Sequence, residues 1–185
     1  MLLHPKNRRD KSEQIGAGQR ILKGVFMSIR VLFICHGNIC RSTLAESLLT
    51  HLVKQQNIAT QFLIDSAATS TEEIGNPPHR GTVSVLKRHG IGVVPHRARQ
   101  MTRADYERYD YLIGMDQANI RNMNRIAGGD PDGKIYKLLS FAGSGRDVAD
   151  PWYTGDFDAT YEDVFEGLTA FLKELKNSGR IEMRI

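Results

Sequence analysis

The residues best suited to chemistry in this sequence form one short segment, Cys35-His36-Gly37-Asn38-Ile39-Cys40-Arg41-Ser42. A loop that leads into a helix directs successive backbone N–H groups toward one point, where the helix dipole adds positive charge. Gly37 is expected to provide the positive φ that such a loop needs. The Arg41 guanidinium can contact two oxygens of one phosphate. The segment therefore predicts a phosphate-binding loop over residues 36–42.

Cys35 is the candidate nucleophile of this loop. The backbone N–H groups, the helix dipole and Arg41 all favour its thiolate form, and such surroundings are typical of reactive cysteines. A thiolate beneath a bound phosphate can attack phosphorus. The Ser42 hydroxyl can donate a hydrogen bond to that sulfur, and again to the departing thiolate when a phosphocysteine is cleaved.

Asp150 is the candidate acid. A phenolate or alkoxide leaves phosphorus poorly, so an acid that protonates it is worth about 10²–10⁴ in rate. Asp150 precedes Pro151, which fixes the backbone, and the aromatic residues Trp152 and Tyr153. We expect these aromatic side chains to shield the carboxyl group and keep it protonated. In a second step the same carboxylate would take a proton from the attacking water.

Other interpretations of these residues remain open. Cys35 and Cys40 can be ordinary buried cysteines, and Asp150 can belong to an Asp-Pro turn followed by buried aromatics. A metal site is not predicted, because the cysteines and His36 lack the C-x2-C spacing and a second ligand cluster. Arg41 can be a surface residue of a helix, but the first helical turn is an unfavourable place for a cation.

Short β-rich runs alternate with helical patterns, without an internal repeat. The run from Ile29 to Cys35 is uncharged after Arg30, which indicates a strand buried on both faces. Apolar residues recur about once per turn over residues 41–56 and predict an amphipathic helix. Further strands are predicted at 60–66, 109–115 and 134–139, a short extended piece at 92–95, and helices at 77–90, 102–109, 116–126 and 160–176.

This alternation predicts an α/β fold: a small doubly wound domain with a four-stranded parallel sheet flanked by helices on both faces. The length of 185 residues suits a single domain, which we assign to residues 27–185. Active sites in such sheets lie beyond the carboxyl ends of the strands. The loop after Cys35 falls at that edge.

The basic charge of the chain is concentrated at its beginning. Residues 1–26 hold six basic and two acidic residues, which accounts for the whole net charge of +4. Residues 27–185 are therefore neutral, and no nucleic-acid partner is predicted. Residues 1–26 are expected to be a disordered extension, either an upstream addition or a mistaken start before Met27.

Apolar runs, signal segments and cysteine number together indicate the compartment in which the protein works. The longest apolar run has five residues, whereas a bilayer span needs about 20, so no membrane partner is expected. The first residues lack the apolar stretch of a secretory signal. Two cysteines cannot form a disulfide framework, and we expect a cytoplasmic protein.

Longer motifs carry a resemblance to a known family. The segments VLFICHGNICRSTLAESLL and DPWY together resemble the low-molecular-weight protein tyrosine phosphatases, and the likeness runs from about Ile29 to the last helix. Further similar segments occur in the family's order, namely TSTEEIGNPPHRG, KRHGI, HRARQMT and MDQAN.

The resemblance implies a role for each matching residue. Cys35 would be the nucleophile, Arg41 the phosphate clamp and Ser42 the partner of the thiolate. Asn38 would shape the loop in left-handed geometry and would be held by His96. The remaining implied roles are Asp150 as general acid and then base, Trp152 and Tyr153 as lining of the substrate cleft, and Cys40 as a reversible disulfide partner of Cys35 under oxidation.

The sequence also departs from the family pattern. Several relatives carry an aromatic residue in the second wall of the cleft, where this chain has Thr71, Glu72 and Glu73. One wall is therefore expected to be acidic, which would disfavour strongly acidic peptides and favour a basic or small substrate.

Three other functions on this fold are alternatives. Protein arginine phosphatases typically have threonine at the position of Ile39, whereas the hydrocarbon of Ile39 suits a phenyl ring. Arsenate reductases need further cysteines, and this chain has none after Cys40. A catalytically silent phosphate-binding module would not need a nucleophile, a clamp and an acid together.

The favoured function is hydrolysis of phosphotyrosine in proteins or peptides through a phosphocysteine. No cofactor and no metal are implied, since cysteine, arginine and backbone supply the charge. Inorganic phosphate or vanadate should compete for the loop.

Overall fold

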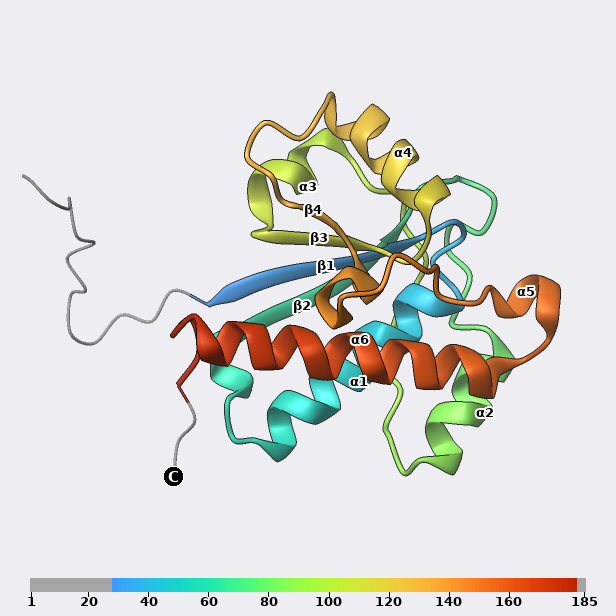
Figure 1. Cartoon of the computed structure of the whole chain (residues 1–185). Helices are drawn as coiled ribbons and strands as arrows, with labels where there is room; N and C mark the ends of the chain where they lie inside the picture. Colours follow the sequence, from blue (N-terminus) through green and yellow to red (C-terminus); the bar gives the residue numbers. More distant parts are fainter. Residues whose placement is uncertain (1–27, 183–185) are drawn as a thin grey trace, which may run out of the picture.

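The computed structural model describes residues 28–182 and has one four-stranded sheet in which all strands are parallel (Figure 1). The spatial order is β2-β1-β3-β4. Their bounds are Ile29–Cys35 for β1, Phe62–Ala68 for β2, Tyr111–Gly114 for β3 and Ile135–Lys137 for β4. The predicted fold class is confirmed.

Side chains of the central strand β1 alternate between two apolar layers. Val31 and Phe33 belong to the larger core, whereas Leu32 and Ile34 belong to the smaller one. All four have no exposed surface. A strand buried on both faces has no polar side of its own, which explains the uninterrupted apolar run.

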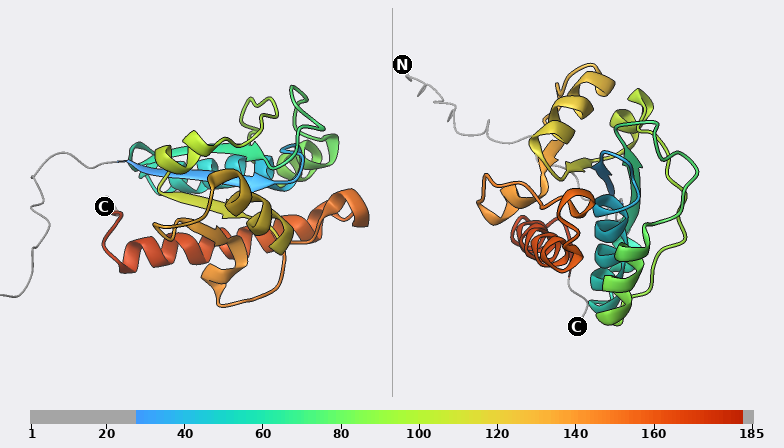
Figure 2. Two further views of the ribbon diagram at one scale, coloured as in Figure 1. Left: turned by 90° about the horizontal axis from the view of Figure 1, so that it is seen from above. Right: turned by 90° about the vertical axis from the view of Figure 1, so that its right-hand side faces the viewer.

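Helices cover both faces of the sheet (Figure 2). Three of them pack together against the larger core: α1 (Arg41–Gln55), α2 (Arg80–Arg88) and α6 (Phe157–Asn177). The opposite face carries α3 (Arg103–Arg108) and α4 (Gln117–Ala127). A short helix, α5 (Pro151–Thr154), precedes α6, and two 3₁₀ turns occupy Ala59–Gln61 and Leu138–Ala142.

Several predicted element bounds are wrong by a few residues. β2 starts at Phe62, because a 3₁₀ turn uses the residues before it, and β4 ends at Lys137, because a second turn follows. β3 begins only at Tyr111, since Tyr109 still caps α3. The piece at 92–95 is not a strand.

Capping residues set the true helix starts. α6 begins at Phe157, three residues earlier than predicted, because the Asp156 side chain accepts a hydrogen bond from the Ala159 N–H. α2 begins after His79 rather than at the two prolines, since the His79 side chain accepts from Gly81 N–H. The predicted caps Thr102 and Asp116 are confirmed as the N-cap residues that directly precede α3 and α4.

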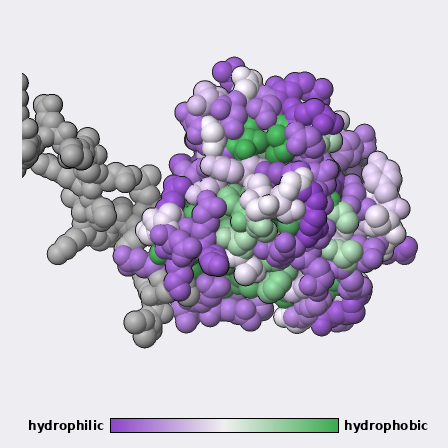
Figure 3. Space-filling model, viewed as in Figure 1, coloured by the Kyte–Doolittle hydropathy of each residue, from purple (hydrophilic) through white to green (hydrophobic). Residues whose placement is uncertain are grey.

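On the face shown in Figure 3 hydrophilic residues predominate and apolar residues appear in small patches. None of the helices in residues 28–182 has the length and apolar character needed to cross a bilayer. The predicted extension at residues 1–26 lies outside the described residues.

Candidate active site

The loop between β1 and α1 has its left-handed residue at Asn38, where φ is 58°. The expectation that Gly37 supplies the positive φ is therefore wrong; asparagine tolerates this conformation better than most residues. Space beside Gly37 is limited, because a Cβ atom there would lie 3.1 Å from Cγ of Glu73 and that side chain would have to shift.

The carbonyls of this loop are bonded on its outer side. Those of Cys35 and His36 accept hydrogen bonds from the N–H groups of Thr69 and Ser70, at 2.9 and 3.0 Å, where the chain leaves β2. The N–H of Asn38 points inward and donates to Cys35 Sγ at 3.3 Å. Backbone donors are thus available on the inner side of the loop, as an anion site requires.

Cys35 lies at the floor of the loop and is 3% exposed. Its Sγ atom is 3.1 Å from Ser42 Oγ. The Asn38 Nδ2 group donates to that same Oγ at 2.9 Å, so the serine oxygen accepts from asparagine and its hydrogen is free to be donated to sulfur. Two donors therefore stabilise a thiolate at this position.

Asn38 is itself fixed by four hydrogen bonds. Its Nδ2 group also donates to Ser66 Oγ at 2.9 Å, and its Oδ1 atom accepts from the Arg99 N–H at 3.1 Å. His96 Nε2 lies 2.7 Å from the same Oδ1. Sequence spacing alone gave no reason to place His96 here; the family resemblance did.

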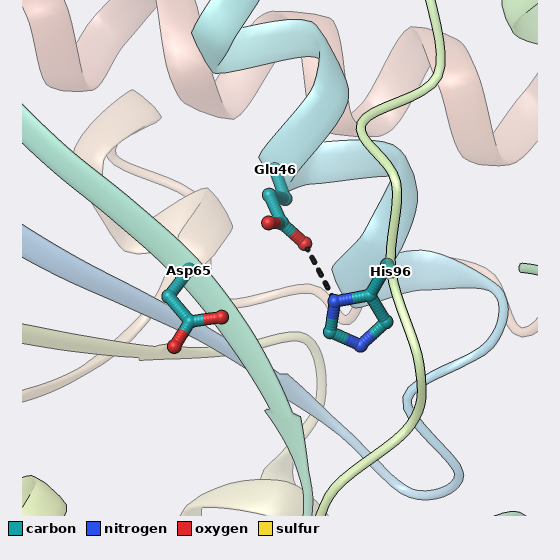
Figure 4. A group of neighbouring side chains, drawn as sticks. All are labelled: Glu46, Asp65 and His96. Atoms are coloured by element: carbon teal, nitrogen blue, oxygen red, sulfur yellow. Dashed lines mark ion pairs between the residues drawn. The ribbon is translucent and has the colours of Figure 1, made fainter. Parts of the chain in front are cut away.

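Behind His96 lie two carboxylates, Glu46 and Asp65, shown in Figure 4. Since Asn38 Oδ1 accepts, His96 Nε2 donates, and the other ring nitrogen, Nδ1, faces Glu46 Oε2 at 3.4 Å. Burial raises the pKa of Glu46 to about 7, although the bonded Ser66 hydroxyl opposes this. Burial also lowers the pKa of His96, against the charge of Asp65. Both shifts favour the neutral forms.

These three side chains bring ligand atoms within 4.8 Å of one another, which a metal site would require. The Asp65 oxygens, however, already accept hydrogen bonds from Arg99 at 2.9 Å, from Tyr109 at 2.9 Å and from the Ser66 N–H at 2.8 Å. A cationic guanidinium beside the carboxylate repels a metal ion. We interpret the group as a support for Asn38.

Arg41 is 2% exposed and uses both ends of its guanidinium. One end donates to Asp116 Oδ2 at 2.7 Å and the other to Asp150 Oδ2 at 2.6 Å. Burial acts to lower the pKa of Arg41, but the neighbouring charges of Cys35, Asp150 and Asp116 raise it overall. The Arg41 guanidinium therefore stays charged, and the two carboxylates fix its orientation.

Asp150 caps the short helix α5, because its Oδ1 atom accepts from the Trp152 N–H at 3.1 Å. The aromatic residues beside it, which were expected to shield the carboxyl group, turn much of their surface to solvent: Trp152 is 59% exposed and Tyr153 is 85% exposed. The carboxyl group is covered on its other side, by Arg41.

One cavity of about 130 Å³ connects these groups. Cys35, Arg41 and Asp150 line it together, although Asp150 lies 109 residues from Arg41 in the sequence. The predicted cleft residues Glu72, Trp152 and Tyr153 also line it, as do the loop residues His36, Gly37, Ile39 and Cys40. Asn38 and Ser42, which also belong to the loop, are not among the residues that line the cavity.

Cys40 has a different environment from Cys35. It is buried, and burial together with the charge of Cys35 raises its pKa to about 12. Cys40 is therefore a neutral thiol. Both cysteines are free in the structure.

The sequence prediction missed three residues of the site. Asp116 was recognised only as a helix cap, but its second oxygen also holds Arg41. Glu73, which belongs to the predicted acidic wall, lines the cavity beside Glu72. Glu46 and Asp65 support His96 from an amphipathic helix and a strand, where neither spacing nor neighbours marked them as unusual.

The family model described as low molecular weight phosphotyrosine protein phosphatase matches residues 30–181. The chain belongs to this family. It is 42% identical over 149 residues to the human low molecular weight phosphotyrosine protein phosphatase, covering 78% of this chain and 94% of the human protein. It is 36% identical over 155 residues to YfkJ, the low molecular weight protein-tyrosine-phosphatase of Bacillus subtilis, covering 83% and 99%.

Solved structures of the low-molecular-weight phosphatases share the fold. The crystal structure of Bacillus subtilis YfkJ matches with a TM-score of 0.78 at 35% identity, covering 88% of this chain and 99% of that one. The Drosophila arginine phosphatase matches with a TM-score of 0.74 at 30% identity, covering 80% and 98%. The resemblance seen in the sequence is confirmed.

Proposed function

We propose that this member of the family hydrolyses phosphotyrosine in proteins, with Cys35 as nucleophile and Asp150 as acid and then base. One observation carries the proposal: the Cys35 sulfur, bonded to two donors, shares a single cavity with the Arg41 fork and the Asp150 carboxyl group. Nucleophile, clamp and proton donor are the three parts that phosphoryl transfer through cysteine needs.

In the first step, phosphate oxygens bind the inner N–H groups of the loop and replace Asp150 on Arg41. The Cys35 thiolate attacks phosphorus, so an S–P bond forms while the P–O bond to the tyrosine breaks. Asp150, protonated, gives its proton to the departing phenolate oxygen. The products of this step are tyrosine and phosphocysteine.

In the second step, the Asp150 carboxylate takes a proton from water, and the water oxygen attacks phosphorus. The S–P bond breaks and Cys35 leaves as a thiolate. Ser42, whose hydrogen is directed at the sulfur by Asn38, stabilises that thiolate. Inorganic phosphate is released and Asp150 is again protonated.

Ile39 supports an aromatic substrate over phosphoarginine. It lines the cavity and presents only hydrocarbon, which packs well against a phenyl ring. Phosphoarginine has a polar guanidinium in the corresponding position. Arsenate reduction is disfavoured because no cysteine follows Cys40 to carry a disulfide outward.

The proposal names the partners as phosphotyrosine proteins or peptides, with inorganic phosphate and vanadate as competing anions. No cofactor enters either step. A nucleophile that must remain a free thiolate suits a reducing compartment such as the cytoplasm.

The test is hydrolysis of p-nitrophenyl phosphate, a phosphotyrosine peptide and a phosphoarginine peptide by the full chain, with EDTA present. We expect turnover of the first two, little on the third, and complete loss in Cys35→Ser with phosphate still bound. Cys40→Ser is the matched control and should keep substantial turnover. Phosphate binding without turnover in the wild type would instead indicate a silent binding module.

A further inference from the structure

The mouth of the active-site cavity has two unlike walls. Glu72 and Glu73 form one, and the exposed aromatic side chains of Trp152 and Tyr153 form the other. We infer that this mouth selects phosphotyrosine flanked by lysine or arginine. The inference rests on the proposed function, since it concerns the residues next to the phosphotyrosine that enters the same cavity.

Glu72 is placed to meet a substrate side chain. Its side chain is 69% exposed, and its Oε2 atom lies 3.0 Å from Nε2 of His36, which also lines the cavity. His36 is the only partner of the Glu72 carboxylate among ion pairs of residues 28–182, and it balances that charge only when protonated. A lysine or arginine of the substrate keeps its charge at any physiological pH and can replace His36 as the partner of Glu72.

Glu73 is held in place more firmly. The Asn76 Nδ2 group donates to its Oε2 atom at 2.6 Å, and its Cγ lies against Gly37 of the phosphate loop. No lysine or arginine forms an ion pair with Glu73 within residues 28–182. Its carboxylate therefore adds a second, unneutralised negative charge to the lining of the cavity beside Glu72.

The aromatic wall also favours a cation. Trp152 and Tyr153 expose their rings beside the cavity, and guanidinium or ammonium groups bind the faces of such rings. A basic side chain next to the phosphotyrosine thus meets either an acid or an aromatic face. An acidic side chain meets repulsion from Glu72 and Glu73 and gains nothing from the rings.

The size of the effect follows from the exposure of these groups. Ion pairs at exposed positions are weak, so each carboxylate changes kcat/KM by about twofold to fivefold between a basic and a neutral neighbour. Replacing the basic neighbour by an acidic one adds repulsion of similar size. The selectivity weakens at high salt, because exposed charges are screened beyond roughly 10 Å at 0.1 M.

The experiment compares three phosphotyrosine peptides that differ only in the two residues flanking the phosphotyrosine, which are lysine, glutamine or glutamate. For the wild type we expect kcat/KM to fall in that order, with a lysine to glutamate ratio of about tenfold or more. Glu72→Gln should lower the ratio about threefold, and Glu72→Lys should bring it to one or below. Glu107→Gln, at an exposed glutamate on α3, is the matched control and should leave the ratio unchanged.

The ratio is measured within one enzyme, so partial unfolding of a variant does not alter it. Equal kcat/KM for all three peptides in the wild type would overturn the inference, even though peptide hydrolysis would still support the proposed function. A ratio that Glu72→Lys leaves unchanged would also overturn it. Loss of turnover on every peptide and on p-nitrophenyl phosphate would instead remove the proposed function.

Discussion

Asp150 makes two bonds in the free protein, and only one of them is compatible with its proposed role. Its Oδ1 atom caps α5, which fixes the carboxyl group at the cavity, while its Oδ2 atom is paired with Arg41. The second bond must open before the carboxyl group can give a proton. Binding of the substrate phosphate opens this bond, because phosphate oxygens replace the Asp150 carboxylate as the partner of Arg41.

Asp150→Asn tests the acid directly. Asparagine is as good a helix cap as aspartate but cannot transfer the proton. We expect kcat on phenyl phosphate to fall by about 10²–10⁴, and kcat on p-nitrophenyl phosphate, whose leaving group needs less help, to fall far less. Asp156→Asn, at the cap of α6, is the matched control. Equal losses on both substrates would exclude Asp150 as the acid.

Arg41→Lys tests the clamp. Lysine keeps the charge but has a single ammonium group, which cannot replace a fork held between Asp116 and Asp150. We expect kcat/KM to fall by about 10²–10³, together with weaker inhibition by inorganic phosphate. An enzyme with full activity and unchanged phosphate inhibition would remove the clamp role.

At the scale of elements, one face of α1 supplies both Ser42, which contacts Cys35, and Glu46, which contacts Ser66. Ser42 and Glu46 are four residues apart, so both side chains point toward the end of β2, where Ser66 lies. Ser66 Oγ donates to Glu46 at 2.6 Å and accepts from Asn38, which donates in turn to Ser42. A continuous set of oriented hydrogen bonds therefore runs from the helix interior to the Cys35 sulfur.

The buried Glu46 gives this part of the fold a pH dependence. Its pKa is raised from 4.5 to about 7, so the folded state binds the proton more tightly than the unfolded state. Its contribution to stability is full below pH 4.5 and is lost as pH rises toward 7. At pH 8 the ionised carboxylate costs on the order of 3 kcal/mol.

Glu46→Gln removes this titration while retaining an oxygen that accepts from Ser66. We expect the variant to gain stability relative to wild type as pH rises: the free energy of unfolding of the variant minus that of wild type should be on the order of 3 kcal/mol larger at pH 8 than at pH 4.5. Urea unfolding of both proteins at the two pH values measures this. A constant difference between the proteins across the pH range would show that Glu46 does not titrate as described.

At the scale of the whole molecule, the sequence predicted correctly those elements that are determined by residues adjacent in the chain. β1 was predicted to the residue, because an apolar strand followed by a glycine-containing loop and a helix is encoded by adjacent residues. Element ends were less accurate, because they depend on caps such as His79 and Asp156. The phosphate loop and Asp150 were recognisable from short motifs.

The missed residues share one physical property: their roles depend on elements that are distant in the sequence. Asp116 lies 75 residues from Arg41, and Asp65 lies 34 residues from Arg99. The orientation of a side chain across such a distance is set by the packing of helices on the sheet, which no motif encodes. The same reason explains why exposure of Trp152 was not foreseen.

β1 is hydrogen-bonded along both edges, to β2 and to β3, and ends at Cys35. Amide hydrogens in such a strand exchange with solvent only when the sheet itself opens. The four residues of α5 can open alone, since few of their backbone bonds reach the rest of the fold. We therefore expect Cys35, the proposed nucleophile, to belong to the last cooperative unit to unfold, and Asp150, the proposed proton donor, to one of the first. Mild denaturation is therefore expected to displace Asp150 from the cavity before it exposes Cys35.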